Sequence, residues 1–451
     1  MLQPFRRQQV AGLRVPRAHI HSDAIGNFVS SCRSCFLFRS LFHTQIVHWK
    51  RDEEAESCQL LSFRPSDLKQ LNALTANDTT RGALALHHLR KGQALVYSGG
   101  DYHNARQLLQ AVKKKNAGKS GCEKKLKKKK CFTQAVETSA QWMQQKQLQR
   151  EQTDILQKIL IQVSIDNSRP SEIMGLKRTP GHVNDIFSYA FKNDSEKMDA
   201  KFGDLTSFLL SLSDFLGMVG GYEWHRKGVY IDALQDYIYP HFGVFPPTRQ
   251  DYIKLLNNIN CDRTQQTSML EVGVGSGVLS IILLQQKKVD RVIGTDVNPY
   301  AIACATDNVR RFGFHENVHL EQADLFPPGN DGDPDRNKFD IVLFNPPWIP
   351  GDAATWLDRS VYDPEQNLLR RFLLQAQHHV NEAGYIYLLL SNLGVLLGLI
   401  REENVHAMFR EGNLELVTVH KTKPKAEVAN KGRAEKMEKG KRHHPDRIAN
   451  A

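Results

Sequence analysis

Four consecutive residues, Asn345-Pro346-Pro347-Trp348, carry the clearest chemistry in this 451-residue chain. They follow an apolar run, residues 339–344, that predicts a buried strand with the asparagine at its exposed end. The Asn345 side-chain carbonyl accepts one N–H of a planar amino group, and the carbonyl of Pro346, held by its ring, accepts the other. The indole of Trp348 stacks on the flat group that bears the nitrogen. The tetrapeptide therefore predicts a site for a planar –NH2 group, although Asn-Pro-Pro also occurs in ordinary loops.

A glycine-rich turn lies upstream, between a predicted strand at residues 268–272 and a predicted helix. Glycine lets the backbone turn tightly there and lets a ligand approach the start of the helix closely. A dinucleotide fingerprint requires a further glycine where this chain has Val278. A small zwitterion without a pyrophosphate, such as S-adenosylmethionine, therefore fits the turn better. The residues concerned are Glu271, Gly273, Gly275 and Gly277.

Acidic side chains end the next two predicted strands. Asp296 ends the strand at 291–295, where an acid typically accepts both ribose hydroxyls, and Asp324 follows the strand at 317–321, where it can accept an adenine amino group. With Asn345, these residues stand at the carboxyl ends of parallel strands, which face one crevice in an open α/β sheet. One shared ligand site is therefore predicted.

From about residue 241, short apolar strands alternate with helices, the pattern of a parallel α/β sheet. No convincing seventh strand is visible in the sequence, so the sheet edge is truncated or completed elsewhere. Residues 52–240 are predicted to form a mostly helical accessory domain, with a helix at 202–219 that ends at Gly220-Gly221. The predicted strands of the C-terminal domain are 268–272, 291–295, 317–321, 339–344, 384–390 and 414–420, and its helices are 277–288, 299–312, 365–381 and 393–408.

These motifs together resemble class I S-adenosylmethionine-dependent methyltransferases, in particular the methyltransferase small domain group. That group includes ribosomal-RNA N-methyltransferases and release-factor glutamine N-methyltransferases. The resemblance covers residues 241–420 and implies a Rossmann-like, mostly parallel sheet that binds S-adenosylmethionine. It also implies that residues 245–249 close over the cofactor, and that the tetrapeptide at 345–348 holds the target amine. The chain departs from the glutamine enzymes at Trp348, where they usually carry tyrosine. The implied cofactor residues are Glu271, Gly273, Gly275, Gly277, Asp296, Asp324 and Asn345.

The net charge of +11 is unevenly distributed. Three segments, residues 1–51, 113–130 and 421–451, carry +7, +9 and +6, so the remainder is acidic. The segment 1–51 has the Arg-rich composition of a mitochondrial transit peptide and is predicted to be disordered, with a cytoplasmic or nuclear location as the alternative. The segments 113–130 and 421–451 are predicted to be a disordered insertion and a disordered tail. All three are either solvated segments or electrostatic arms for RNA.

Three functions remain open on the sequence alone. RNA is the first substrate choice, because the basic segments and an aromatic, basic cluster at residues 222–227 suit a nucleic acid. A protein glutamine is the second choice, and a non-catalytic RNA-binding factor that keeps the fold is the third. The sequence predicts neither a metal site nor a membrane span, and Cys32 and Cys35 form a single CxxC without a matching pair. Oligomeric state is left open.

Overall fold

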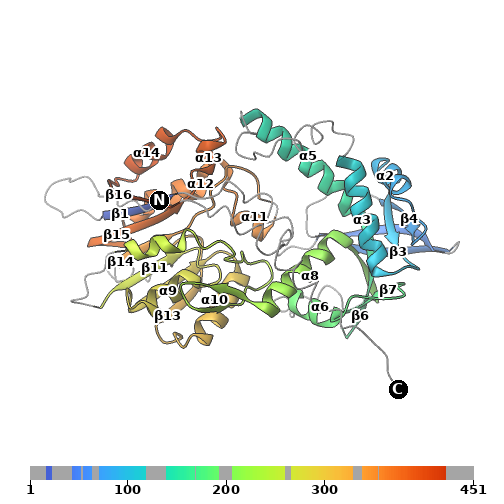
Figure 1. Cartoon of the computed structure of the whole chain (residues 1–451), viewed down its shortest axis with the longest axis horizontal. Coiled ribbons are helices and arrows are strands. Elements are labelled where there is room, and N and C mark those ends of the chain that lie inside the picture. The colour runs from blue at the N-terminus through green and yellow to red at the C-terminus, as the bar shows by residue number, and fades with distance from the viewer. Residues whose placement is uncertain are drawn as a thin grey trace, which may run out of the picture.

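The computed structural model contains two α/β lobes, each built on a seven-stranded sheet (Figure 1). It describes residues 17–22, 43–51, 54–62, 71–117, 139–167, 169–191, 206–259, 266–328, 338–353 and 355–422. The predicted disordered insertion at 113–130 begins inside helix α3 (Tyr102–Ala117), so its first five residues are helical, and the remainder lies outside the described residues. The predicted tail at 421–451 begins at the last residue of the strand Leu416–Lys421, and its residues beyond 422 lie outside the described residues. Within the described residues, no helix is long and apolar enough to cross a membrane.

The C-terminal lobe confirms the predicted Rossmann-like sheet, in the order β13-β12-β11-β14-β15-β1-β16. Each neighbouring pair of strands runs parallel. The central strands are apolar runs buried on both faces, as parallel sheets require. The strands are β11 (Ser268–Val272), β12 (Arg291–Asp296), β13 (Val318–Gln322), β14 (Phe339–Phe344), β15 (Val380–Leu390) and β16 (Leu416–Lys421).

Helices cover both faces of this sheet and bury two apolar clusters. One cluster packs the apolar helix α9 against the sheet, and the other packs α12 and α14 against the opposite face. The chain order reverses between β11 and β14, which places a ligand crevice at their carboxyl ends. The helices are α9 (Val278–Gln285), α10 (Pro299–Arg311), α11 (Trp356–Arg359), α12 (Asn367–Ala376), α13 (Leu393–Leu396) and α14 (Glu402–Glu411).

The seventh strand comes from the N-terminal end of the chain. Strand β1 (Arg17–Ser22) lies between β15 and β16 and pairs with both, with Arg17 opposite Tyr385 and His19 opposite Thr418 (Figure 1). Strand β2 (His43–Arg51) joins the other sheet. The structure therefore differs from the predicted disordered leader at these two stretches. Strand pairing between distant segments depends on backbone hydrogen bonds, which composition does not reveal.

The N-terminal lobe is α/β, so the prediction of a largely helical domain is corrected here. Its sheet has the order β5-β4-β2-β3-β8-β6-β7. A continuous apolar run reads equally as a buried strand or a buried helix, which explains the error at β6. The remaining strands are β3 (Glu54–Ser62), β4 (Leu71–Ala76), β5 (Ala94–Tyr97), β6 (Ile159–Asp166), β7 (Arg169–Met174) and β8 (Ser207–Ser211). The helices are α2 (Gly82–Arg90), α3 (Tyr102–Ala117), α5 (Ser139–Gln157), α6 (Val183–Phe191) and α8 (Leu212–Lys227).

Helix α8 passes through Gly220-Gly221, where the sequence predicted an end. It ends instead at Gly228, whose φ of 70° suits glycine. A Cβ atom at Gly221 would lie 2.9 Å from Phe242 Cδ2, so glycine there permits close packing. After α8, the short hairpin β9 (Val229–Ile231) and β10 (Asp236–Ile238) leads into the C-terminal lobe.

Candidate active site

A pocket at the carboxyl ends of β11, β12 and β14 brings together most of the predicted site residues. Gly277 and Pro346 are the predicted residues outside its lining. Gly277 caps the start of α9 with a φ of 79°, and Pro346 is buried beside the lining. The predicted residues that line the pocket are Glu271, Gly273, Gly275, Asp296, Asp324, Asn345, Pro347 and Trp348.

The glycine turn between β11 and α9 takes backbone conformations that favour glycine. Gly273 and Gly275 have φ values of 69° and 54°. The turn is fixed from the neighbouring strand, because the Val274 N–H donates to the Thr295 carbonyl at 2.9 Å. Beside it, the Gly275 N–H donates to Asp296 Oδ2 at 3.0 Å. With no side chain at Gly273 and Gly275, the turn leaves an open backbone surface along the pocket.

Asp296 holds the turn and the start of α10 together. Its Oδ1 accepts the Asn298 N–H at 2.9 Å, while its Oδ2 accepts the Gly275 N–H. Burial raises the pKa of Asp296 to about 6, and the two backbone donors oppose that rise. A carboxylate offers about four lone-pair sites, so each oxygen retains one for a ligand in the pocket. This geometry fits the predicted role in binding ribose hydroxyls.

Glu271 lies beneath the glycine turn and is 2% exposed. It accepts a hydrogen bond from the hydroxyl of Ser280 on α9. Burial raises the pKa of Glu271 to about 8. Burial thus favours the protonated form of this carboxyl group, which also ties α9 to β11.

We expect Glu271→Gln to stabilise the protein increasingly as the pH rises. The folded protein binds the Glu271 proton more tightly than the unfolded chain, so this group lowers the free energy of unfolding as pH rises from 4.5 to about 8. Glutamine still accepts from Ser280 but does not ionise. Melting temperatures from pH 5 to 9 test this: the gap between variant and wild type should widen with pH. Parallel curves would contradict the assigned burial of the charge.

Asp324 sits in the turn after β13, on the exposed side of the pocket. One of its oxygens pairs with Arg371 on α12 at 2.7 Å. Arg371 therefore orients the carboxylate, and the predicted contact with adenine would be made by the other oxygen, Oδ1. No local sequence pattern predicts this ion pair, because the two residues lie 47 positions apart in the chain.

The tetrapeptide follows β14 directly, with Asn345 and Trp348 half-buried and the two prolines buried. The Trp348 indole N–H donates to Asn345 Oδ1 at 3.2 Å. The ring of Trp348 also meets Phe245 edge to face, with centroids 6.5 Å apart. Trp348 therefore orients the asparagine carbonyl, whose second lone pair remains for a target N–H.

The segment expected to close over the cofactor does reach the pocket, since Phe245 and Pro247 line it. Asn298 joins this segment to α10: its side-chain N–H donates to the Gly243 carbonyl at 3.0 Å, and its Oδ1 accepts the Tyr300 N–H at 3.0 Å. Sequence reasoning missed Asn298, although an asparagine before a proline signals a helix start. It also missed Arg359 and Ser360, which line the pocket from the loop around α11 without a local sequence signal.

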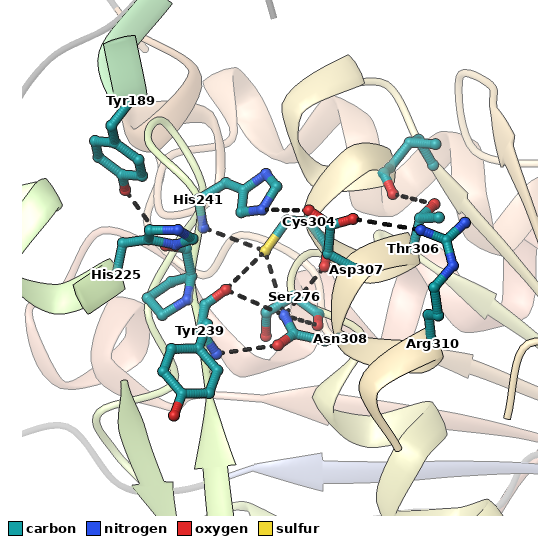
Figure 2. A network of polar contacts seen from close by, with 12 residues as sticks. Tyr189, His225, Tyr239, His241, Ser276, Cys304, Thr306, Asp307, Asn308 and Arg310 are labelled. Atoms are coloured by element: carbon teal, nitrogen blue, oxygen red, sulfur yellow. Dashed lines mark hydrogen bonds and ion pairs between the residues drawn. The ribbon is translucent and has the colours of Figure 1, made fainter. Parts of the chain in front are cut away.

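A polar network behind the glycine turn connects the two lobes (Figure 2). The Asn308 side chain donates to the carbonyls of Ser276, in the turn, and Tyr239, in the connecting segment, both at 3.2 Å. His241 pairs with Asp307 at 3.1 Å, and its backbone N–H donates to the sulfur of Cys304 at 3.2 Å. The cofactor side of the pocket is thus anchored through α10.

The aromatic and basic cluster at residues 222–227 is not part of the pocket lining. It forms the end of α8, where Glu223 pairs with both Arg226, at 3.3 Å, and Lys227, at 2.6 Å. These pairs offset the local positive charge that suggested phosphate binding. Among the described residues, no group of three or more His, Cys, Asp or Glu side chains could hold a metal ion.

Comparison with known proteins identifies the C-terminal lobe. Its sheet has the Rossmann-like order given above, and residues 237–395 match the family model of the methyltransferase small domain. The resemblance predicted from the motifs is confirmed for this region, as are the enzyme class and the cofactor, S-adenosylmethionine.

Three relatives indicate the range of the similarity. A putative protein N5-glutamine methyltransferase of Methanocaldococcus jannaschii is 28% identical over 34% of this chain and 75% of its own length. A release factor glutamine methyltransferase of Geobacter sulfurreducens is 31% identical over 32% of this chain and 49% of its own length. A tRNA adenine-N6-methyltransferase of Mannheimia succiniciproducens is 34% identical over 19% of this chain and 34% of its own length. The chain thus spans three quarters of the first relative and half or less of the others.

Proposed function

We propose that this protein methylates a planar –NH2 nitrogen, most readily the exocyclic amino group of a base in RNA. The observation that carries the proposal is the position of Asn345. Its carbonyl lies at the end of β14, in the same pocket as Asp296 and the glycine turn, and is oriented by the Trp348 indole at 3.2 Å. An acceptor held beside the cofactor pocket suits a nitrogen that gains positive charge as it is methylated.

The reaction requires positioning more than proton transfer by side chains. S-adenosylmethionine supplies a methyl group on a sulfonium, which is already activated for displacement. The chain contributes an acceptor for the target N–H at Asn345, a second acceptor at the Pro346 carbonyl, and a flat apolar face at Trp348. As the N–H groups become more acidic in the transition state, their hydrogen bonds to these carbonyls strengthen.

RNA is the substrate class that the charge distribution supports. The basic segments at 1–51, 113–130 and 421–451 provide sequence-independent affinity for a phosphate backbone. Arg359, which also lines the pocket, adds a positive charge to it. One relative, the tRNA adenine-N6-methyltransferase, is named for this kind of substrate.

A protein glutamine is the second candidate, because two of the relatives above are named as glutamine methyltransferases. A glutamine carboxamide presents the same planar –NH2 group to Asn345. A non-catalytic factor is the weaker reading, since Asp296 and Asn345 are both present and both line the pocket.

Labelling distinguishes these functions. The purified full-length chain is incubated with S-adenosylmethionine carrying a tritiated methyl group and an extract from a strain lacking the enzyme. The full chain is used because residues 17–22 and 43–51 form strands of the two sheets. Label released by RNase supports the RNA proposal, whereas label released by protease supports the glutamine reading. Absence of label in both, with cofactor binding intact, supports a non-catalytic role.

We expect a steep salt dependence if RNA is the substrate. Release of counterions from RNA lowers affinity as salt rises, so labelling at limiting RNA should fall by about tenfold or more between about 50 and 200 mM salt. Cofactor affinity, measured by calorimetry in the same buffers, serves as the control and should change little. Labelling that is insensitive to salt would favour the glutamine substrate.

A mitochondrial location is proposed from the composition of residues 1–51. Because Arg17–Ser22 form a strand in the catalytic sheet, a cleaved leader compatible with this fold would end before Arg17. Cell fractionation followed by sequencing of the mature N-terminus tests both the location and the cleavage point.

A further inference from the structure

Helix α5 starts against the catalytic lobe, although its sequence belongs to the N-terminal lobe. Its C-terminal end is held in the N-terminal lobe, where Gln157 donates to Asp214 on α8 at 2.8 Å. Near its other end Trp142, which is 6% exposed, packs into a cluster of the catalytic lobe. Helix α5 therefore covers the loop that follows the target tetrapeptide. The buried members of the cluster are Ile349, Val361, Leu393 and Leu397.

Lys146 lies one helical turn after Trp142 and faces the same loop. Its ammonium group is 4.9 Å from the Trp142 ring centroid and 4.5 Å from that of Tyr362, and it donates a hydrogen bond to the Tyr362 hydroxyl. Burial lowers the pKa of Lys146 to about 8, while Asp358 attracts and Arg150 repels its charge. Two aromatic faces and a hydroxyl thus hold this cation between the lobes.

The contacts continue from Tyr362 to the target site. Tyr362 forms a parallel bridge with Ile349, and the backbone N–H groups of Trp348 and Ile349 both donate to the Val361 carbonyl at 3.1 Å. Trp348 in turn donates its indole N–H to Asn345. Lys146 is therefore linked to the asparagine carbonyl through one tyrosine, a short backbone pairing and one tryptophan.

We propose that Lys146 is a positioning residue for methyl transfer. It holds Tyr362 against the loop and thereby fixes Trp348 and Asn345 in the geometry that receives the target nitrogen. The N-terminal lobe thus completes the substrate side of the active site. This inference rests on the proposed function, because it assigns Lys146 to the same target site.

Lys146→Met tests the proposal, because methionine keeps much of the stem but removes the charge and the donor. Hydrogen exchange of the Trp348 and Ile349 amides should accelerate about tenfold or more, as should that of the Asp363 amide, which donates to the Ile349 carbonyl at 2.9 Å. On a substrate found by labelling, kcat should fall by about tenfold to a hundredfold, since small misplacements of a reacting group have effects of that size. Affinity for S-adenosylhomocysteine should stay within about twofold of wild type, and Lys146→Arg, which keeps a cation against the two rings, should restore most of kcat.

Two further variants provide a second test of the Lys146–Tyr362 contact and a control on the same helix. Tyr362→Phe removes only the hydroxyl acceptor and should reproduce the faster exchange even if Lys146→Met folds poorly. Arg150→Gln, on the same helix, breaks the exposed ion pair with Asp352 and should change neither exchange nor kcat. Unchanged hydrogen exchange in both Lys146→Met and Tyr362→Phe overturns the proposal. An unchanged kcat in Lys146→Met also overturns it. Hydrogen exchange is measured without substrate. A failure to methylate RNA or protein would therefore overturn the proposed function without deciding whether Lys146 orders the loop.

Discussion

Asn345→Ala is expected to lower turnover by about a hundredfold to a thousandfold, the size of effect seen when one preorganised hydrogen bond is removed from an active site. Its carbonyl is fixed by the Trp348 indole at 3.2 Å and lies in the pocket beside the cofactor turn. Alanine leaves the target nitrogen with the Pro346 carbonyl alone, so its growing positive charge is less well stabilised. Single-turnover rates with the labelled substrate measure the loss.

The same variant should bind S-adenosylhomocysteine almost as well as wild type, because the ribose contacts are predicted to be made by Asp296. Asn345→Asp keeps an acceptor oxygen and should retain more activity than the alanine variant. Trp348→Phe keeps the aromatic face but removes the indole N–H, and should lower turnover by less than Asn345→Ala. If turnover and cofactor affinity fell equally in Asn345→Ala, the asparagine would be a cofactor ligand and its assigned role would be wrong.

The catalytic sheet could be predicted from sequence because its signals are local. The runs at 268–272 and 339–344 match strands β11 and β14, and the glycine turn follows the first of them. The carboxyl ends of parallel strands meet at one edge. The placement of Asp296 and Asn345 in one pocket therefore followed from strand order alone.

The other half of the molecule depends on distant contacts, which local patterns do not report. Strand β1 completes a sheet whose other strands begin some 250 residues later, and nothing in its composition indicates pairing. Strand β6, at 159–166, lies in the region predicted to be mostly helical, because a fully buried strand lacks the alternation of a half-exposed one. Lys146 meets Tyr362 across 216 positions in the chain, so the closure of the target site by α5 was beyond sequence reasoning.

Asp296→Ala should weaken binding of S-adenosylhomocysteine by about a hundredfold or more. Hydrogen bonds to a charged group contribute about 1.5–3 kcal/mol each, and this carboxylate is placed to accept two from ribose. The variant also removes the acceptor of the Gly275 and Asn298 N–H groups, which loosens the turn. Calorimetry measures the loss. Glu321→Gln, on the neighbouring strand β13 but outside the pocket lining, is the matched control and should bind normally.

The pH dependence of cofactor affinity provides a second test of Asp296. Because burial raises its pKa to about 6, the carboxylate that accepts ribose hydroxyls is lost as the pH falls through that value. Wild-type affinity should therefore decline below about pH 6 and be constant between that value and the pKa of Glu271, about 8. The asparagine in Asp296→Asn does not titrate, so the weaker cofactor affinity of this variant should show no decline below about pH 6. A step that persists in the asparagine variant would assign the titration to another group, and would remove the evidence that an ionised Asp296 holds the ribose.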